Sequence, residues 1–369
     1  MWGLVFASFA VFGVLGVIYL IFGIRRFAFF KKLVGKNKIW NILCILIPAI
    51  IVGTLLLWNV MNAVVVILHW LVFWVICDIL AVLVRRIRGI KKNDSVKPYL
   101  AGIIAVIITA SYIVYGWFSA HNVVETDYTV ETTKLENGES LRIIMLSDSH
   151  TGAIFDGDEF MDYAKEIEKL HPDLVVMVGD MVDDGTTYEN MVMSCKALGS
   201  ISSTYGSYYV FGNHDKRYFG NGYYTVEQLR ESLAEYGVKI LEDERSYIFD
   251  DKVCIVGRQD ANVKDRKPAV VLRDTIPDDV FTVVLDHQPN DYKAESGMNF
   301  DLVLSGHTHG GQMFPIGLVS KIFGMNDMIY GIDTIGNTTF IVSSGIADWE
   351  IPFKMGCCSE YVVIDVLGK

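Results

Sequence analysis

The sequence predicts a two-part protein, an all-α membrane domain with four transmembrane helices followed by an α/β domain. Two observations carry this prediction. Residues 1–120 are largely apolar and contain only two acidic residues, whereas residues 121–369 contain 41 acidic and 20 basic residues. In the second part, short apolar runs typical of buried strands alternate with stretches of helical periodicity. We expect the membrane domain over 1–120, a linker or edge strand over 121–140, and the ordered α/β domain from Leu141 to the end.

Four apolar stretches are predicted to cross the bilayer, whose core takes about 20 helical residues. The first span is residues 1–24. The uncharged run 39–77 is too long for one crossing, and the polar stretch 58–62 divides it. The third span then covers residues 63–84, and the fourth runs from about 98 to 120.

The basic residues of the membrane part predict its orientation. All twelve lie in two loops, within residues 25–38 and 85–97, and none lies between the second and third spans. By the positive-inside rule both loops are cytoplasmic, so the N-terminus and everything after residue 120 lie outside. Asp78 lies within the third span, His69 lies two and a half turns before it, and no second acid or base is close enough in the sequence to make a relay with Asp78. We therefore expect Asp78 to serve helix packing or to reach the interface, in preference to ion transport.

The charge and cysteine patterns exclude some classes of function. Residues 121–369 carry a net charge of −21, which argues against a nucleic-acid partner. The six cysteines include no CxxC pair and do not form the pattern of a disulfide framework, so a zinc knuckle is not indicated. A small phosphorylated substrate remains compatible with this acidity if bound metal supplies positive charge.

Five predicted strands of the second part end in clusters of Gly, Asp, Asn and His. The clusters are Asp148-Ser149-His150, Gly179-Asp180, Gly212-Asn213-His214-Asp215, Asp286-His287 and Gly306-His307-Thr308-His309. Ligand sites in α/β sheets form beyond the carboxyl ends of strands. One such cluster would be read as a turn, but five in one domain predict a site. Carboxylates and imidazoles are ligands of divalent ions, and two ions held by such groups activate a bridging water for attack on phosphorus.

These motifs, in this order, resemble the five motifs of the calcineurin-like metallophosphoesterases over about residues 141–365. The stretches 172–180 and 306–312 resemble the membrane-anchored bacterial branch, some members of which cleave UDP-diacylglucosamine. The resemblance implies an α/β sandwich of two mixed β-sheets flanked by helices. It also implies a metal-dependent phosphoric ester hydrolase.

The resemblance further implies which residues hold two divalent ions and which act on substrate. The first ion would be bound by Asp148, His150 and His309, the second by Asn213, His287 and His307, and Asp180 would bridge both. His214 would protonate the leaving group or hold the phosphate, and Asp215 would orient its ring. Mixed oxygen and nitrogen ligation does not select among manganese, iron and zinc.

Four further charged residues are ambiguous in the sequence. Asp286 either supports His287 from behind or faces solvent. Lys216 and Arg217 follow the His214 loop and either bind substrate phosphate or form an exposed charge pair. Arg258 is a weaker candidate for substrate binding.

The apolar segment 313–330 leaves the last motif directly. It either dips into the lipid surface and admits a lipid-linked phosphoester, or packs on the core of its own domain. We expect a multi-pass cell-membrane phosphoesterase with an extracytoplasmic catalytic domain. The sequence does not decide between a diester, a monoester and a pyrophosphate. The alternative is a membrane-tethered phosphate-binding sensor without turnover, since four spans exceed what an anchor needs.

Overall fold

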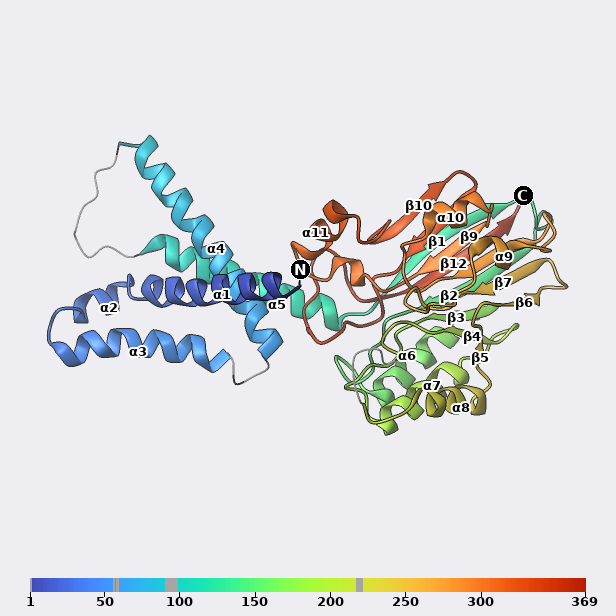
Figure 1. Ribbon diagram of the computed structural model, residues 1–369, viewed down its shortest axis with the longest axis horizontal. Coiled ribbons are helices and arrows are strands. Elements are labelled where there is room, and N and C mark those ends of the chain that lie inside the picture. Colours follow the sequence, from blue (N-terminus) through green and yellow to red (C-terminus); the bar gives the residue numbers. More distant parts are fainter. Residues whose placement is uncertain (1, 56, 58–59, 90–98, 217–221) are drawn as a thin grey trace. The chain divides into compact units, whose positions relative to one another are not determined.

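The computed structural model describes residues 2–55, 57, 60–89, 99–216 and 222–369, and of residues 2–12 it describes the backbone alone. The chain forms two compact units, Met1–Tyr115 and Gly116–Lys369. Figure 1 shows a helical first part and a second part built on two sheets.

The first unit is helical, as the sequence predicts. Its helices are α1 (Trp2–Ile24), α2 (Ala28–Leu33), α3 (Lys38–Leu55), α4 (Val60–Ile87) and α5 (Leu100–His121), the last of which continues into the second unit. Helices α3, α4 and α5 are long and apolar enough to cross a membrane, which agrees with three of the four predicted spans. The first predicted span is the apolar helix α1, and its crossing stays a prediction. Residues 58–59, most of the second basic loop and the start of the fourth predicted span lie outside the described residues.

Asp78 in α4 has a basic partner that the sequence analysis missed. Arg26 donates to both of its carboxylate oxygens, at 2.5 and 3.1 Å. The hydroxyls of Tyr19 and Tyr99 also donate to it, so Asp78 joins α1, α4 and the start of α5. Arg26 lies 52 residues away in sequence, in the loop that follows α1, so no local pattern pairs the two. These contacts favour the helix-packing role.

The second unit contains two six-stranded sheets, which confirms the predicted two-sheet α/β fold. Sheet A has the order β1-β12-β2-β3-β4-β5 and sheet B the order β10-β11-β9-β8-β7-β6. The strands of sheet A are β1 (Val124–Thr132), β2 (Ser140–Leu146), β3 (Leu174–Val178), β4 (Ser207–Val210), β5 (Lys239–Ile240) and β12 (Glu360–Gly368). Those of sheet B are β6 (Glu244–Ile248), β7 (Val253–Gly257), β8 (Phe281–Leu285), β9 (Leu302–Ser305), β10 (Gly331–Ile335) and β11 (Thr338–Val342).

Helices cover the outer faces of both sheets. Sheet A is covered by α6 (Gly157–Glu168), α7 (Tyr188–Ser200) and α8 (Val226–Glu235), and sheet B by the short helices α9 (Ala269–Arg273) and α10 (Tyr292–Gly297). The 3₁₀ turn η1 (His309–Gly311) and helix α11 (Ile316–Phe323) follow β9. Helix α6 starts where the Asp156 carboxylate accepts the Asp158 and Glu159 N–H groups, a capping box that stabilises its first turn.

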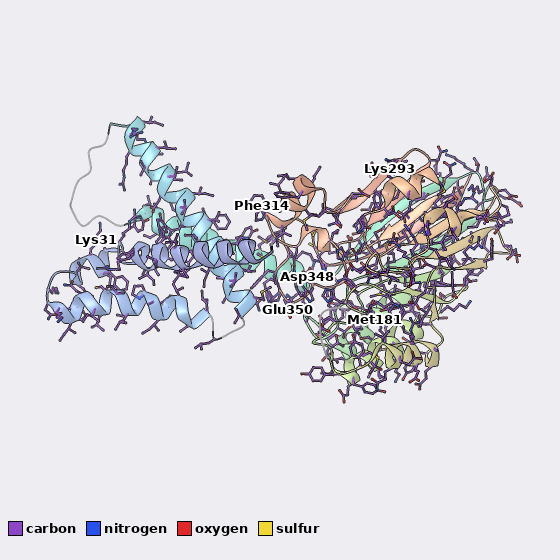
Figure 2. The ribbon with its side chains drawn as sticks, in the orientation of Figure 1. Lys31, Met181, Lys293, Phe314, Asp348 and Glu350 are labelled. Carbon is purple, nitrogen blue, oxygen red and sulfur yellow. The ribbon has the colours of Figure 1, made fainter. Side chains whose placement is uncertain are left out.

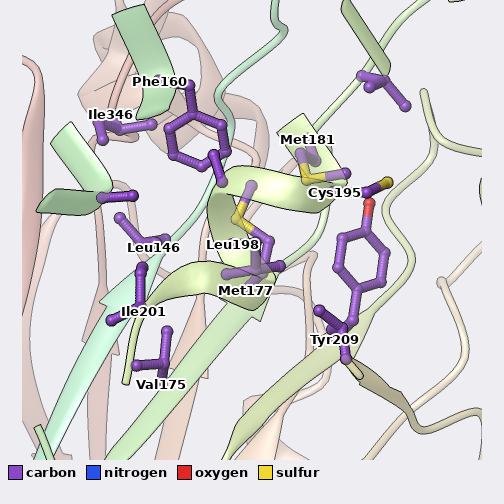
Figure 3. Close-up of a cluster of buried hydrophobic side chains, with 14 of the residues drawn as sticks. Leu146, Phe160, Val175, Met177, Met181, Cys195, Leu198, Ile201, Tyr209 and Ile346 are labelled. Atoms are coloured by element: carbon purple, nitrogen blue, oxygen red, sulfur yellow. The ribbon is translucent and has the colours of Figure 1, made fainter. Parts of the chain in front are cut away.

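The core lies in layers because strand side chains alternate between faces. In β2, Ile143 and Met145 belong to the cluster between the two sheets, whereas Ile144 and Leu146 belong to the cluster under the helices. Figure 3 shows Phe160 of α6 and Leu198 of α7 among the side chains of this second cluster. A fully buried side chain of this size contributes about 1.5–3 kcal/mol.

Ordered structure begins before Leu141, contrary to the prediction. Strand β1 forms the edge of sheet A and pairs in parallel with β12, with Val124 opposite Glu360. Of the two predictions for the polar segment 121–140, a linker or an edge strand, the structure has the edge strand with its connection. The partner strand lies more than 200 residues away, and one face of β1 is solvated, so its own residues show little apolar signal.

The five predicted strand ends belong to both sheets. Strands β2, β3 and β4 run parallel in sheet A, and β8 and β9 run parallel in sheet B. Parallel strands place their carboxyl ends at one edge, so each sheet contributes its own set of polar clusters. The candidate site forms where these two sets meet.

Candidate metal centre

The predicted ligand residues come together in two groups. One contains Asp148, His150 and His309, and the other contains Asp180, His287 and His307. Within each group the ligand atoms lie within 4.8 Å of one another, a spacing that one ion can bridge. The first group has the same members as the set that the family resemblance implies for the first ion, and the second contains His287 and His307 of the other set together with the predicted bridge Asp180; Asn213 belongs to neither group. The individual roles remain predictions.

Asp148 at the end of β2 is held against the loop that follows β9. Both of its carboxylate oxygens accept the backbone N–H of His307, at 3.0 Å each. Gly306 permits this approach, because a Cβ at that position would lie 2.3 Å from Asp148 Oδ2. The glycine before the two histidines is therefore required by contact between the two sheets.

Asp180 lies next to ligands of both groups. Its Oδ2 is 3.0 Å from His287 Nε2 and 3.9 Å from His150 Nε2. Its Oδ1 accepts the backbone N–H of His214 at 2.8 Å, which ties the candidate proton donor to the same carboxylate. This position fits the bridging role predicted for Asp180.

In two histidines a contact at Nδ1 fixes the orientation of the ring. His287 Nδ1 lies 2.8 Å from the Val178 carbonyl oxygen, and His309 Nδ1 lies 3.1 Å from Asp348 Oδ1. Because a carbonyl or a carboxylate can only accept, each Nδ1 carries the proton and each Nε2 is left to bind an ion. The Nε2 of His309 is 3.7 Å from Asp148 Oδ1.

Asp215 contacts the site through the backbone. Its Oδ2 accepts the N–H groups of Asp180 and Gly212, both at 2.8 Å, and its Oδ1 accepts that of Val182 at 3.2 Å. Asp215 is fully buried. These contacts indicate that it sets the path of the two loops that carry Asp180 and His214, and its effect on the His214 ring remains a prediction.

Five of the seven predicted ligands have a left-handed backbone conformation. Their φ angles are 52° for Asp148, 36° for His150, 52° for Asp180, 69° for His307 and 49° for His309. Non-glycine residues seldom adopt positive φ, and each such residue costs on the order of 1–3 kcal/mol. Clusters of strained residues of this kind are typical of functional sites.

Two neighbouring carboxyl groups of the site, Asp180 and Asp215, have pKa values that are shifted in opposite directions. Burial would raise the pKa of Asp180, but the nearby His287 and His150 hold this pKa below its usual range. For Asp215 burial, followed by the charge of Asp180, raises the pKa to about 6. Asp180, the residue placed between the two ligand sets, therefore stays ionised at any pH near neutrality, whereas Asp215 takes up a proton as the pH falls through about 6.

The histidines also differ in their pKa. Burial, followed by the charge of His287, lowers the pKa of His307 to about 4, so this imidazole is neutral at pH 7, as a metal ligand must be. Burial would lower the pKa of His150, but Asp183 and Asp180 raise it. The carboxylates therefore favour a positive charge in the site, which is a protonated imidazole in the metal-free protein. Bound cations would supply that charge instead.

Unpaired buried atoms test whether the residues fit metal ions. Nε2 of His150 and Oδ1 of Asn213 have no hydrogen-bond partner among the described residues. Buried polar atoms are nearly always paired, so such orphaned donors and acceptors indicate a ligand. Mixed carboxylate, imidazole and amide donors suit divalent transition metals, and the donor set fits two ions.

Three ambiguous charged residues have structural partners. Arg258 is buried and donates to Asp286 at 3.0 Å and to Glu295 at 2.7 Å. Asp286 is therefore not solvent-facing; it supports the strand end that carries His287. Lys216 pairs with Glu242 and lies over the Phe211 ring, so its charge is already neutralised. Arg217 lies outside the described residues.

Three residues near the site were missed by sequence reasoning. Asp183 Oδ2 lies 3.5 Å from His150 Nδ1, Asp348 contacts His309, and the Trp349 ring lies 5.2 Å from the His214 ring, centroid to centroid. The last two follow β11, but six and seven residues after its end, so they did not stand out as a polar cluster at a strand end. Figure 2 shows Asp348 and Glu350 in this loop.

Known proteins resemble this chain over most of its length. The family pattern described as calcineurin-like phosphoesterase matches residues 141–311. A transmembrane protein with metallophosphoesterase domain from Danio rerio is 27% identical over 88% of this chain and 79% of its own length. An uncharacterized metallophosphoesterase from Campylobacter jejuni is 31% identical over 72% of this chain and 70% of its own length. A crystal structure of a dimetal phosphatase from Danio rerio is 10% identical, with a TM-score of 0.35 over 56% of this chain and 87% of that one.

Proposed function

Because the chain belongs to the calcineurin-like metallophosphoesterases, we propose that it is a membrane-anchored phosphoesterase with two divalent ions and an extracytoplasmic catalytic domain. Residues 1–120 would be the anchor and residues 141–369 the catalytic domain. The observation that carries the proposal is the position of Asp180 next to both ligand groups, with the His214 N–H on its second oxygen.

Each residue of the site has a part in this reaction. The bound ions would supply a nucleophilic water at neutral pH and neutralise charge on the phosphoryl oxygens. Asp180 would hold the two ions at a fixed separation, and the remaining ligands would complete each coordination shell. His214 lies at the rim, with its ring 5.0 Å from that of His150, centroid to centroid, where it can give a proton to the leaving oxygen.

Turnover of a chromogenic phosphodiester by the purified full-length protein tests the proposal. We expect activity with at least one of manganese, iron and zinc. His214→Ala should lower kcat by about 10²–10⁴-fold while both ions stay bound. His171→Ala, at a turn outside the site, is the control. In sealed vesicles with the outer face exposed, a membrane-impermeant diester should be cleaved without detergent.

Two results would contradict the proposal. Absence of turnover with all three metals would favour a phosphate-binding sensor. Cleavage of the impermeant diester only after detergent is added would reject the extracytoplasmic orientation.

A lipid-linked phosphoester is the substrate class that we propose, because α11 presents an apolar surface beside the site. Seven apolar side chains of residues 314–325 are exposed, and the largest exposed fractions are 75% at Phe323 and 68% at Ile322. Figure 2 shows Phe314 next to this helix. The segment does not bury these side chains on the core of its own domain. Exposed apolar patches of this kind are typical of membrane or partner contact.

The base of this segment is connected to the end of α5, a candidate span. The Met355 N–H donates to the Gln312 carbonyl at 2.6 Å, and the neighbouring Lys354 N–H donates to the Gly116 carbonyl at 2.8 Å. Gln312 is three residues from His309. The apolar segment, a predicted metal ligand and the last turns of a candidate span are therefore joined by two backbone hydrogen bonds.

Replacing Leu318 and Phe323 by Ser should lower turnover of a lipid-borne phosphoester in vesicles by about 10²-fold or more, since each large side chain that is buried in lipid is worth about 1.5–3 kcal/mol. Turnover of a soluble aryl phosphate should be unchanged. The matched control is the pair Val270→Ser and Val271→Ser on α9, which are exposed to a similar degree. Equal loss on the soluble and lipid substrates would count against the lipid-linked class.

A further inference from the structure

We propose that Asp348 is a positioning residue for the first ligand group, held in place by the buried Lys354; this inference rests on the proposed function. Asp348 is fully buried, and its Oδ1 lies 3.1 Å from His309 Nδ1. Without this partner the His309 ring can rotate about its Cβ–Cγ bond. The contact fixes the tautomer and aims Nε2 at the oxygens of Asp148.

Lys354 is a fully buried lysine whose ammonium group contacts residues of its own loop. Its Nζ lies 3.4 Å from Asp348 Oδ1 and donates to the Ser344 and Ala347 carbonyls at 2.7 and 3.2 Å. Lysine is almost never fully buried without a charged partner. The ammonium group therefore holds the loop of residues 344–354 together by hydrogen bonds. It fixes the position of Asp348 next to Nδ1 of His309.

The same loop is also hydrogen-bonded to Gln312, three residues after His309. The Gln312 side-chain amide donates to the Trp349 carbonyl at 3.1 Å and to that of Ile351 at 3.4 Å. His309 is thus held through Asp348 on its ring and through Gln312 on its backbone. Residues 344–354 have no ligand atom in either group, so their effect on an ion passes through the first ligand group, by way of His309 and of Asp148, whose carbonyl accepts the Ala347 N–H at 3.2 Å.

Loss of Asp348 should lower the affinity of the protein for one of the two ions. Loss of a partner behind a ligating histidine typically weakens metal affinity 10–100-fold. Since Asp348 contacts the first ligand group and not the second, one binding step should weaken and the other should remain. A loop that only supported the fold would affect both steps together.

Metal titration of the full-length protein against a metallochromic chelator, with manganese or zinc, tests this inference. Asp348→Asn should weaken one of two binding steps 10–100-fold. This variant leaves the Lys354 charge without its carboxylate and should also lower the melting temperature of the metal-free protein. The double variant Asp348→Asn, Lys354→Met removes both charges; its melting temperature should return toward that of the unmodified protein while the weakened step persists.

The matched control is the pair Asp301→Asn, Lys134→Met, which removes an ion pair of 2.8 Å at the other end of β9. It should leave both binding steps unchanged. Unchanged affinity in the Asp348 double variant, or equal loss at both steps that the double variant restores, would overturn the inference. Turnover of the same samples separates the two proposals. If the unmodified protein binds two ions but has no activity, and the Asp348 variants weaken one binding step, only the proposed function is rejected. A protein that binds no divalent ion would overturn both.

Discussion

Asp180→Asn is expected to lower kcat/KM for a phosphodiester by on the order of 10³-fold, since stabilisation of transition-state charge by bound ions is worth several kcal/mol. One carboxylate oxygen lies 3.0 Å from a nitrogen of the second ligand group and 3.9 Å from one of the first. An amide has one oxygen and no charge, so it cannot hold two cations at once. Metal analysis of the same protein should show fewer than two ions per chain.

Asp162→Asn is the control for this substitution. Asp162 is an exposed carboxylate on α6 that pairs with Lys165 at 2.7 Å, and its loss should leave both turnover and metal content unchanged. Full activity of Asp180→Asn with two bound ions would contradict the bridging role and require another shared ligand.

Asp215→Ala is expected to have the largest effect on stability. It would leave the buried N–H groups of Asp180, Val182 and Gly212 without their acceptor. Each unpaired buried group costs about 1–3 kcal/mol, so for three groups the free energy of unfolding of the α/β unit should fall by about 3–9 kcal/mol. Urea unfolding followed by circular dichroism measures this change.

Asp215→Asn separates the loop role from a role on the His214 ring. The amide oxygen can still accept two N–H groups. The loss of unfolding free energy in Asp215→Asn should therefore be about half of the loss in Asp215→Ala. Unchanged stability in Asp215→Ala, with loss of turnover alone, would show that Asp215 acts on His214 and not on the loops.

Much of the candidate site could be predicted from the chain. The clusters after Leu146, Val178, Val210, Leu285 and Ser305 each follow a short apolar strand, and the polar residues come directly after it. This signal is local, because one strand and its own end carry it. The same holds for the apolar spans, whose length and lack of charge are properties of single stretches.

Other features depend on residues that are distant in sequence. Asp286 had two readings until Arg258, 28 residues earlier, was found to donate to it. Asp348 gave no motif, since its role comes from His309, 39 residues before it. The segment of strand β1 had two readings, linker or edge strand, because its partner β12 lies more than 200 residues later in the sequence. In each case the decisive partner lies outside any window over which periodicity can be read.

The sequence alone determined the chemistry of this protein: apolar spans, five polar strand ends, and carboxylates and imidazoles in an order that matches one family. Tertiary structure decided how these groups are used. It placed Asp180 between two ligand groups, turned Asp215 toward backbone N–H groups, buried Lys354 behind His309, and left the side chains of α11 exposed. The physical reason is that residue type sets which atoms can bind an ion, whereas distance and burial, which only packing of the two sheets creates, set which atoms meet.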